Sequence, residues 1–248
     1  MENKINGYLE LNNSIFKISS IDDLKHFLSR LGEEMEEMTQ IDFQKLCAVV
    51  KYGNTVPDDC MVEYSEDGKY LIHTYNSYLK DYKVLDKTIY IRDSAFYNKD
   101  DKNHLGHLLL PNSVIAIGSS SFMNCRQLQT IIMSDNLQFI GKSAFFDCFG
   151  LKDFDFPNNL KYLESDAFNG CSSLTSIVLP SHLRVLGSHA FKGCKSLMSI
   201  CFKSQDIEIG SGVFEECSSL ERIIIPKGFR NKYEALLPFD KEKLIESE

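Results

Sequence analysis

The sequence contains no apolar run that approaches the ~20 residues of a transmembrane helix, so we expect no membrane insertion. It also lacks an excess of basic residues, because 27 Lys and Arg stand against 35 Asp and Glu for a net charge of -8. Such a chain offers no basic surface for nucleic acid. Residues 1–10 lack the basic stretch and apolar core of a signal peptide, which predicts a cytoplasmic protein. The alternative is a surface or secreted protein whose leader is missing from this sequence.

One pattern of apolar residues recurs five times at a fixed spacing. Phenylalanines stand 23 residues apart at Phe122, Phe145, Phe168, Phe191 and Phe214. A cysteine follows each of them by three residues, a leucine follows each cysteine by three, and an aliphatic residue precedes each phenylalanine by five. This repeat predicts a solenoid, because a unit of 23 residues buries its apolar side only against its neighbours.

Each unit is predicted to consist of a strand, a turn and a second short strand. The alanines before Phe145, Phe168 and Phe191 predict a single tight helical turn at that point. Glycines recur just before the turn, where we expect the backbone to bend too sharply for a side chain; Glu164 is the exception. A degenerate copy begins at Ile91 and contains three extra residues, which predicts a surface bulge within residues 98–107.

Eight cysteines raise the question of disulfides. Five of them share one repeat position: Cys125, Cys148, Cys171, Cys194 and Cys217. A shared position in stacked units predicts a buried column of small side chains, so we expect free thiols rather than paired ones.

The units "IGKSAFFDCFGLKDFDFP", "LESDAFNGCSSLTSIVLP" and "LGSHAFKGCKSLMSICFK" carry a family resemblance. They resemble the BspA-like leucine-rich repeats, and the match extends over residues 89–226. The resemblance implies a repeat protein used for recognition, in a family often exported to bacterial surfaces and often assigned to adhesion.

Three regions are expected. Residues 1–83 lack the repeat and predict a mixed α/β N-terminal cap, with a hairpin over residues 7–19, helices after Ser20 and Thr39, and a second hairpin around Gly68. Residues 84–229 form the solenoid. Residues 230–248 form a closing segment with short helices over residues 232–237 and 241–246, or alternatively a frayed tail. The predicted fold class is therefore an α+β N-terminal cap followed by a BspA-like leucine-rich-repeat β-solenoid with 23-residue repeats.

The strand after each repeat leucine alternates between inward and outward positions, which yields two outward ladders. The first contains Thr130, Asp153, Ser176, Ser199 and Arg222. The second contains Ile132, Asp155, Val178, Cys201 and Ile224. Four apolar residues on an outward ladder exceed what a solvated sheet needs, so we predict a partner-binding face. The alternatives are that residues 1–83 or a second copy of the chain covers this face, or that the exposed aliphatics are unremarkable.

Catalytic chemistry has little support in the sequence. Its glycines belong to the repeat rather than to a nucleotide-binding loop, and we expect no cofactor and no metal. Two alternatives stay open: a Cys60–His73 nucleophile pair across the second hairpin, and a metal site formed by His104 and His107 with Asp100 and Asp101.

The predicted function is therefore a non-catalytic protein-interaction module with an unidentified protein partner. One alternative is an effector or enzyme whose activity lies in residues 1–83 and whose repeats select the target. The other is a bacterial surface adhesin that lacks its leader.

Overall fold

The computed structural model describes residues 7–11, 14–18, 55–74, 76–97, 103–152, 154–238 and 240–247. The chain forms two compact units, residues 1–53 and 54–248. In the first unit, β1 (Gly7–Leu11) pairs antiparallel with β2 (Ser14–Ile18), which confirms the first predicted hairpin. The two helices predicted after Ser20 and Thr39 lie outside the described residues.

The second unit begins with an antiparallel meander of three strands. β3 (Thr55–Pro57) pairs with β4 (Val62–Ser65), and β4 pairs with β5 (Tyr70–Thr74). The β4–β5 pair confirms the hairpin predicted around Gly68. β5 then pairs in parallel with β7 (Tyr90–Ile91), so the meander leads directly into the stacked coils.

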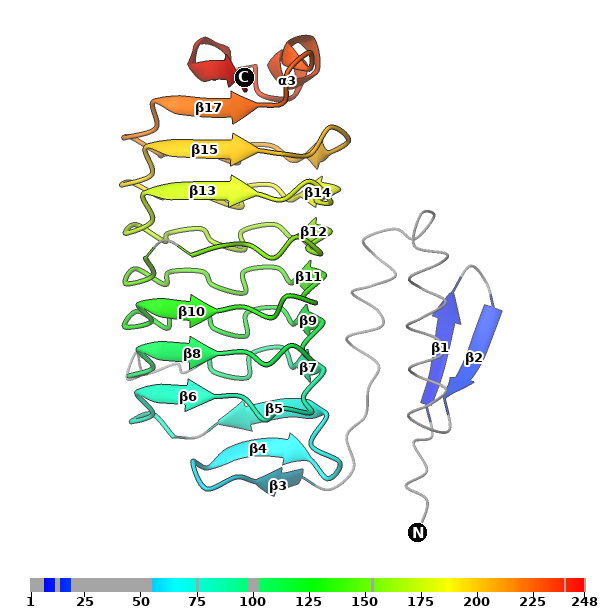
Figure 1. Cartoon of the computed structure of the whole chain (residues 1–248). Coiled ribbons are helices and arrows are strands. Elements are labelled where there is room, and N and C mark those ends of the chain that lie inside the picture. The colour runs from blue at the N-terminus through cyan, green and yellow to red at the C-terminus, as the bar shows by residue number, and fades with distance from the viewer. Residues whose placement is uncertain are drawn as a thin grey trace. The chain divides into compact units, whose positions relative to one another are not determined.

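From β5 onward the second unit winds into coils whose short strands stack in parallel on two sides (Figure 1). On one side, the strand before each repeat phenylalanine joins a sheet of nine strands within the described residues. Its later members are β9 (Ala116–Ile117), β11 (Phe139–Ile140), β12 (Tyr162–Leu163), β14 (Val185–Leu186) and β16 (Glu208–Ile209). Corresponding residues of successive repeats are paired in register, so the repeat forms the predicted β-solenoid.

The opposite side of the coils carries two smaller sheets. One contains β6 (Asp81–Lys83), β8 (His107–Leu109) and β10 (Thr130–Ile132). The other contains β13 (Ser176–Leu179), β15 (Ser199–Phe202), β17 (Arg222–Ile225) and β18 (Leu244–Glu246). Residues 154–156 occupy the repeat position between these sheets without being assigned to a strand. β5 and β6 already belong to the stack, although both precede residue 84.

The repeated apolar residues form continuous columns inside the coils. Neighbouring phenylalanine rings from Phe96 to Phe214 stack with centroids 4.9–6.3 Å apart. Each cysteine of the repeat is buried, and its Sγ donates to a phenylalanine carbonyl of the preceding coil, as from Cys171 to Phe145 O at 3.2 Å. These cysteines are free, so the predicted column of thiols is confirmed.

The recurring glycines have a different cause from the one predicted. Gly187 and its equivalents Gly118, Gly141 and Gly210 do not adopt a left-handed backbone. Instead, a Cβ on Gly187 would lie 2.2 Å from Ser165 N of the preceding coil. The glycine column is therefore required by the close approach of adjacent coils, and the expectation of a sharp bend was wrong.

The left-handed residues lie in the turn around each phenylalanine. The residue two positions before each repeat phenylalanine has a left-handed backbone in successive coils. Examples are Ser143 with φ 55° and His189 with φ 59°. A second left-handed residue precedes each cysteine, as in Asp147 and Gly193. Two such residues per coil reverse the chain within a few positions. The segment around each phenylalanine therefore consists of hydrogen-bonded turns, and the prediction of a helical turn was wrong.

The far end of the solenoid is closed by α3 (Arg230–Leu236), the 3-10 helix η1 (Lys241–Lys243) and β18. The buried Tyr233 donates its hydroxyl to Ser204 O at 2.7 Å and packs edge-on against Phe202. A helix is present where one was predicted at residues 232–237. The segment 241–246, also predicted as a helix, is helical only over η1, and its second half is β18, which pairs with β17. Within the described part of the chain, no helix has the length and hydropathy required to cross a membrane.

Candidate partner-binding face

The predicted outward ladders lie on the strand side formed by β6, β8, β10, β13, β15, β17 and β18. Burial alternates along these strands, with pattern exposed, buried, exposed, buried along β13. Parallel pairing aligns Ser176 with Ser199 and Val178 with Cys201. The same register continues from β15 to β17, so each ladder crosses the strands without a shift.

Side-chain exposure differs between members of the second ladder. Ile132 is 63% exposed and Val178 is 40% exposed, whereas Cys201 and Ile224 are half-buried. Asp155 is exposed at the same ladder position, and the predicted Asp153 lies outside the described residues. Aliphatic side chains therefore meet solvent across this face, interrupted by one carboxylate.

The structure extends both ladders beyond the residues that the repeat identified. Asp81 and His107 align with Thr130 on the first ladder. Leu109 aligns with Ile132, and Ile245 aligns with Ile224, on the second ladder. The repeat did not identify these residues, because β6, β8 and β18 belong to coils that have lost the repeat motif. The only signal available was a short apolar alternation, which is too common to assign a register.

The first ladder is polar at its N-terminal end. His107 Nδ1 lies 2.6 Å from Thr130 Oγ1, and His107 Nε2 lies 3.9 Å from Asp81 Oδ1. The three side chains occupy neighbouring strands of one sheet. His107 and Thr130 are hydrogen-bonded, whereas Asp81 lies near His107 without a hydrogen bond to it. This end of the face is therefore a hydrogen-bonded polar surface.

The C-terminal end of the second ladder is apolar without interruption. Val178, Cys201, Ile224 and Ile245 occupy four adjacent strands in register, and we call these four residues the aliphatic stripe. Burial raises the pKa of the Cys201 thiol, and the charge of nearby Lys203 opposes this shift. The thiol is thus neutral at physiological pH and acts as part of an apolar surface.

The Cys60–His73 pair has the wrong electrostatics for a nucleophile. Burial raises the pKa of the Cys60 thiol, and the carboxylates of Asp58 and Asp59 raise it further. Nucleophilic cysteines need a lowered pKa, because the thiolate is the reactive form. The surroundings of Cys60 therefore favour the unreactive thiol.

The two histidines of the proposed metal site have separate partners. His104 Nδ1 lies 2.8 Å from Ser77 O, and His107 is bonded to Thr130 as described above. Residues 100–101 lie outside the described residues. Across the ranges that the structure describes, no group of three or more His, Cys, Asp or Glu side chains is arranged to hold a metal ion.

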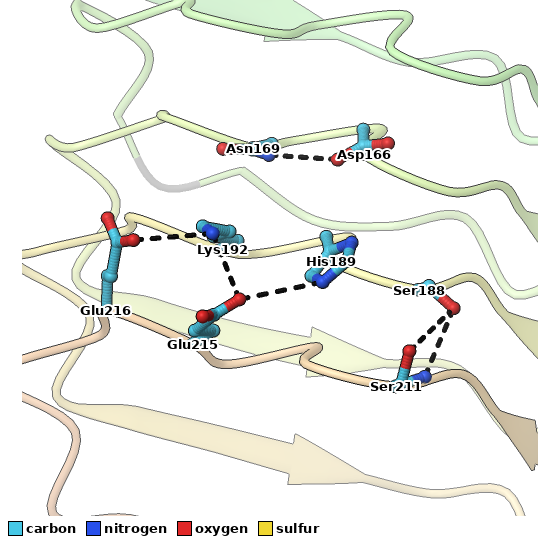
Figure 2. Close-up of polar contacts among 8 residues, drawn as sticks. All are labelled: Asp166, Asn169, Ser188, His189, Lys192, Ser211, Glu215 and Glu216. Atoms are coloured by element: carbon cyan, nitrogen blue, oxygen red, sulfur yellow. Dashed lines mark hydrogen bonds and ion pairs between the residues drawn. The ribbon is translucent and has the colours of Figure 1, made fainter.

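The turn side of the C-terminal coils carries polar contacts between neighbouring coils (Figure 2). Glu215 Oε2 lies 3.0 Å from Lys192 Nζ and 3.5 Å from His189 Nε2, and Lys192 also pairs with Glu216. The hydrogen bond between them raises the pKa of Lys192 and lowers the pKa of Glu215. Opposite charges thus pair across the coils, so this cluster joins coils and leaves little unpaired charge for a ligand.

Comparison with known proteins agrees with this architecture. Residues 73–173 match, in six copies, the model of the BspA type leucine rich repeat region. No protein of curated function matches the sequence.

Several bacterial leucine-rich repeat proteins of known structure share the fold. The T. pallidum leucine rich repeat protein is 23% identical with a TM-score of 0.57, over 74% of this chain and 96% of that one. A leucine rich cell surface protein from Faecalibacterium prausnitzii is 20% identical with a TM-score of 0.54, over 71% and 55%. A leucine-rich repeat protein from Bacteroides ovatus is 23% identical with a TM-score of 0.53, over 72% and 49%. This chain thus spans about half the length of the last two proteins.

Proposed function

Because residues 73–173 match the model of the BspA type leucine rich repeat region, we propose that the chain is a non-catalytic recognition module that binds a protein partner through its outward strand face. The observation that carries this proposal is the aliphatic stripe. Four apolar side chains lie in register on adjacent strands, and Val178 and Ile245 are 40% and 46% exposed. A contiguous apolar patch rimmed by polar residues is typical of a protein-binding surface.

The contacting residues that we assign are the two outward ladders. The first contributes Thr130, Asp153, Ser176, Ser199 and Arg222, and the second contributes Ile132, Asp155, Val178, Cys201 and Ile224. The members of these ladders that the structure describes project from stacked coils paired in register, so binding costs little ordering of the backbone. An extended face of this kind suits a macromolecular partner better than a small molecule, which needs a concave pocket.

The absence of catalysis is part of the proposal and has its own support. The Cys60 thiol has a raised pKa. His107 contacts Thr130 and His189 contacts Glu215, and each of these contacts joins neighbouring coils. These arrangements stabilise stacking. They do not activate a nucleophile.

A surface location is a second version of the same role. The F. prausnitzii protein that shares this fold is named as a cell surface protein. A surface adhesin would use the same outward face against a partner outside the cell. The alternative of an effector whose activity lies in residues 1–83 has no comparable support.

The test is a comparison of partner capture by two double variants. Val178→Asp/Ile224→Asp places two carboxylates within the aliphatic stripe, and Val56→Asp/Met61→Asp makes the same change on apolar residues that are 50% and 60% exposed at the other end of the second unit. The unsubstituted chain is used to capture proteins from a lysate and a surface extract of the native cell, and mass spectrometry identifies them. Each identified protein is then purified and titrated against the two variants. We expect the affinity for the partner to fall at least tenfold in the first variant and to stay unchanged in the second. Unchanged affinity for the first variant, with an unchanged circular dichroism spectrum, would exclude the face.

A further inference from the structure

The aliphatic stripe is flanked by two cations that have no ion-pair partner among the described residues. Arg222 lies beside it on the first ladder, two residues before Ile224. Lys203 lies on the other side, two residues after Cys201, and its charge acts on the Cys201 thiol. Both side chains belong to exposed residues, and neither contributes an ion pair in the described part of the chain, where Lys192 and Lys232 do.

The separation between the two cations matches the width of a helix. Alternate residues on one strand are about 6.6 Å apart, so the columns of Arg222 and Lys203 are separated by about 13 Å across the stripe. An α-helix with its side chains is about 10–12 Å wide. A helix that lies on the stripe would therefore have one cation along each flank.

The length of the stripe also matches the spacing of residues on one helix face. Neighbouring strands are about 4.8 Å apart, so the four strands of the stripe extend over about 14 Å. Ten residues of helix cover about 15 Å, and apolar residues seven positions apart are separated by about 10.5 Å, close to two rungs. Apolar anchors at i, i+3 or i+4, and i+7 would thus fall onto successive gaps between the rungs.

We propose that the aliphatic stripe binds an amphipathic α-helix of the partner protein, with apolar residues on the stripe and Asp or Glu residues facing Arg222 and Lys203. This inference rests on the proposed function and specifies the class of partner segment. Charge complementarity decides between occupants, because the whole chain carries a net charge of -8 while this part of its surface presents unpaired positive charge. A neutral or basic helix would leave both cations unsatisfied or repelled.

The experiment uses the full chain and two synthetic helical peptides of about 15 residues. Both carry leucines at i, i+4, i+7 and i+11; one carries glutamates along both flanks, and the other carries lysines at the same positions. Fluorescence anisotropy at low ionic strength measures their affinities, because salt screens the contacts in question. We expect the glutamate peptide to bind at least tenfold more tightly than the lysine peptide.

Charge reversal in the protein provides the decisive comparison. In Lys203→Glu/Arg222→Glu the preference should invert, so that the lysine peptide binds more tightly. Lys142→Glu/Lys195→Glu makes the same change at exposed cations away from the stripe and should keep the original preference. Equal affinities, no measurable binding of either peptide, or a preference that survives Lys203→Glu/Arg222→Glu would overturn the inference.

The outcomes separate this inference from the proposed function. If the natural partner is lost with Val178→Asp/Ile224→Asp but retained with Lys203→Glu/Arg222→Glu, the face binds a partner that is not an acidic helix. If light scattering shows a concentration-dependent dimer that Val178→Asp/Ile224→Asp abolishes, the occupant is a second copy of the chain. Either result would overturn the inference, and only an unchanged partner affinity in Val178→Asp/Ile224→Asp would overturn the proposed function as well.

Discussion

The inner columns and the outward ladders lie on the same strands and obey different rules. On β13, Ile177 faces inward with 2% exposure, whereas its neighbour Val178 faces outward with 40% exposure. The inward position is apolar in every coil of the repeat, as Ile131, Ile177, Ile200 and Ile223 show. The outward position beside it changes from Ile132 to Asp155 to Val178. Regularity thus marks packing, and variation marks the surface.

The difference follows from what each side chain contacts. An inward residue meets the equivalent residue of the coils before and after it, so each coil must offer the same shape. An outward residue meets solvent or a partner, so no neighbouring coil constrains its chemistry. The non-repeating polar and apolar residues on the ladders are therefore where we expect the specificity of the proposed binding face to be encoded.

The largest effect should come from breaking an inner column in its middle. Phe168 packs against the rings of Phe145 and Phe191 at 4.9 and 5.7 Å, and against two further phenylalanines. We expect Phe168→Ala to lower the free energy of unfolding by about 3–5 kcal/mol, because it leaves a cavity lined by rigid coils. Urea unfolding followed by circular dichroism measures the loss.

Phe96→Ala is the matched change near the N-terminal end of the same column. Its ring packs against Phe122 at 4.9 Å and against Tyr82 at 6.0 Å, so fewer aromatic contacts disappear. A smaller loss than for Phe168→Ala is expected. Equal losses would show that the column does not depend on neighbours from both sides.

A smaller effect should appear when alkaline pH acts on the inner cysteines. Burial raises the pKa of the Cys125, Cys148 and Cys171 thiols above their ordinary value. Each thiol is therefore protonated in the folded state at a pH where the unfolded chain already ionises. The stabilisation is complete below the unfolded pKa and is lost as pH rises above about 8.5, by up to ~1.4 kcal/mol per pH unit for each thiol.

Cys171→Ala isolates this contribution. The variant lacks one titrating group, so its free energy of unfolding should fall less steeply than that of the parent chain between pH 9 and pH 10.5. Urea titrations at several pH values in a reducing buffer provide the slopes. Identical slopes would indicate that other groups, such as the buried Tyr64 with its pKa raised to about 12, dominate the alkaline loss.

The repeat made the interior predictable from sequence alone. Because every coil places the same residue in the same column, the positions of Phe145, Cys148 and Leu151 fix those of Phe168, Cys171 and Leu174. The fold class and the outward register of Val178 and Ile224 followed from that periodicity.

The remaining features depend on contacts that no periodicity records. The glycine column was attributed to a bend, although Gly187 is required because a Cβ at this position would lie 2.2 Å from Ser165 N of the preceding coil. Ile245 joined the aliphatic stripe through a strand predicted as a helix, because the closing segment has no motif to set its register. The unpaired charges of Arg222 and Lys203 could not be foreseen, because the pairing of a charge depends on its neighbours in space.

The smallest change in the free energy of unfolding should come from Val178, the outward residue of the neighbouring pair Ile177 and Val178 on β13. Ile177→Thr places a hydroxyl in the interior and removes apolar contacts, so it should cost about 2–3 kcal/mol. Val178→Thr is nearly isosteric at a position that is 40% exposed and should change the free energy of unfolding by less than about 0.5 kcal/mol. The same Val178→Thr substitution should weaken partner binding severalfold, because it places a polar group at the aliphatic stripe. Chemical unfolding and partner titration of the two single variants measure both quantities. If Val178→Thr destabilised the fold as strongly as Ile177→Thr, the outward ladder would be part of the packing, and the contrast between columns and ladders would fail.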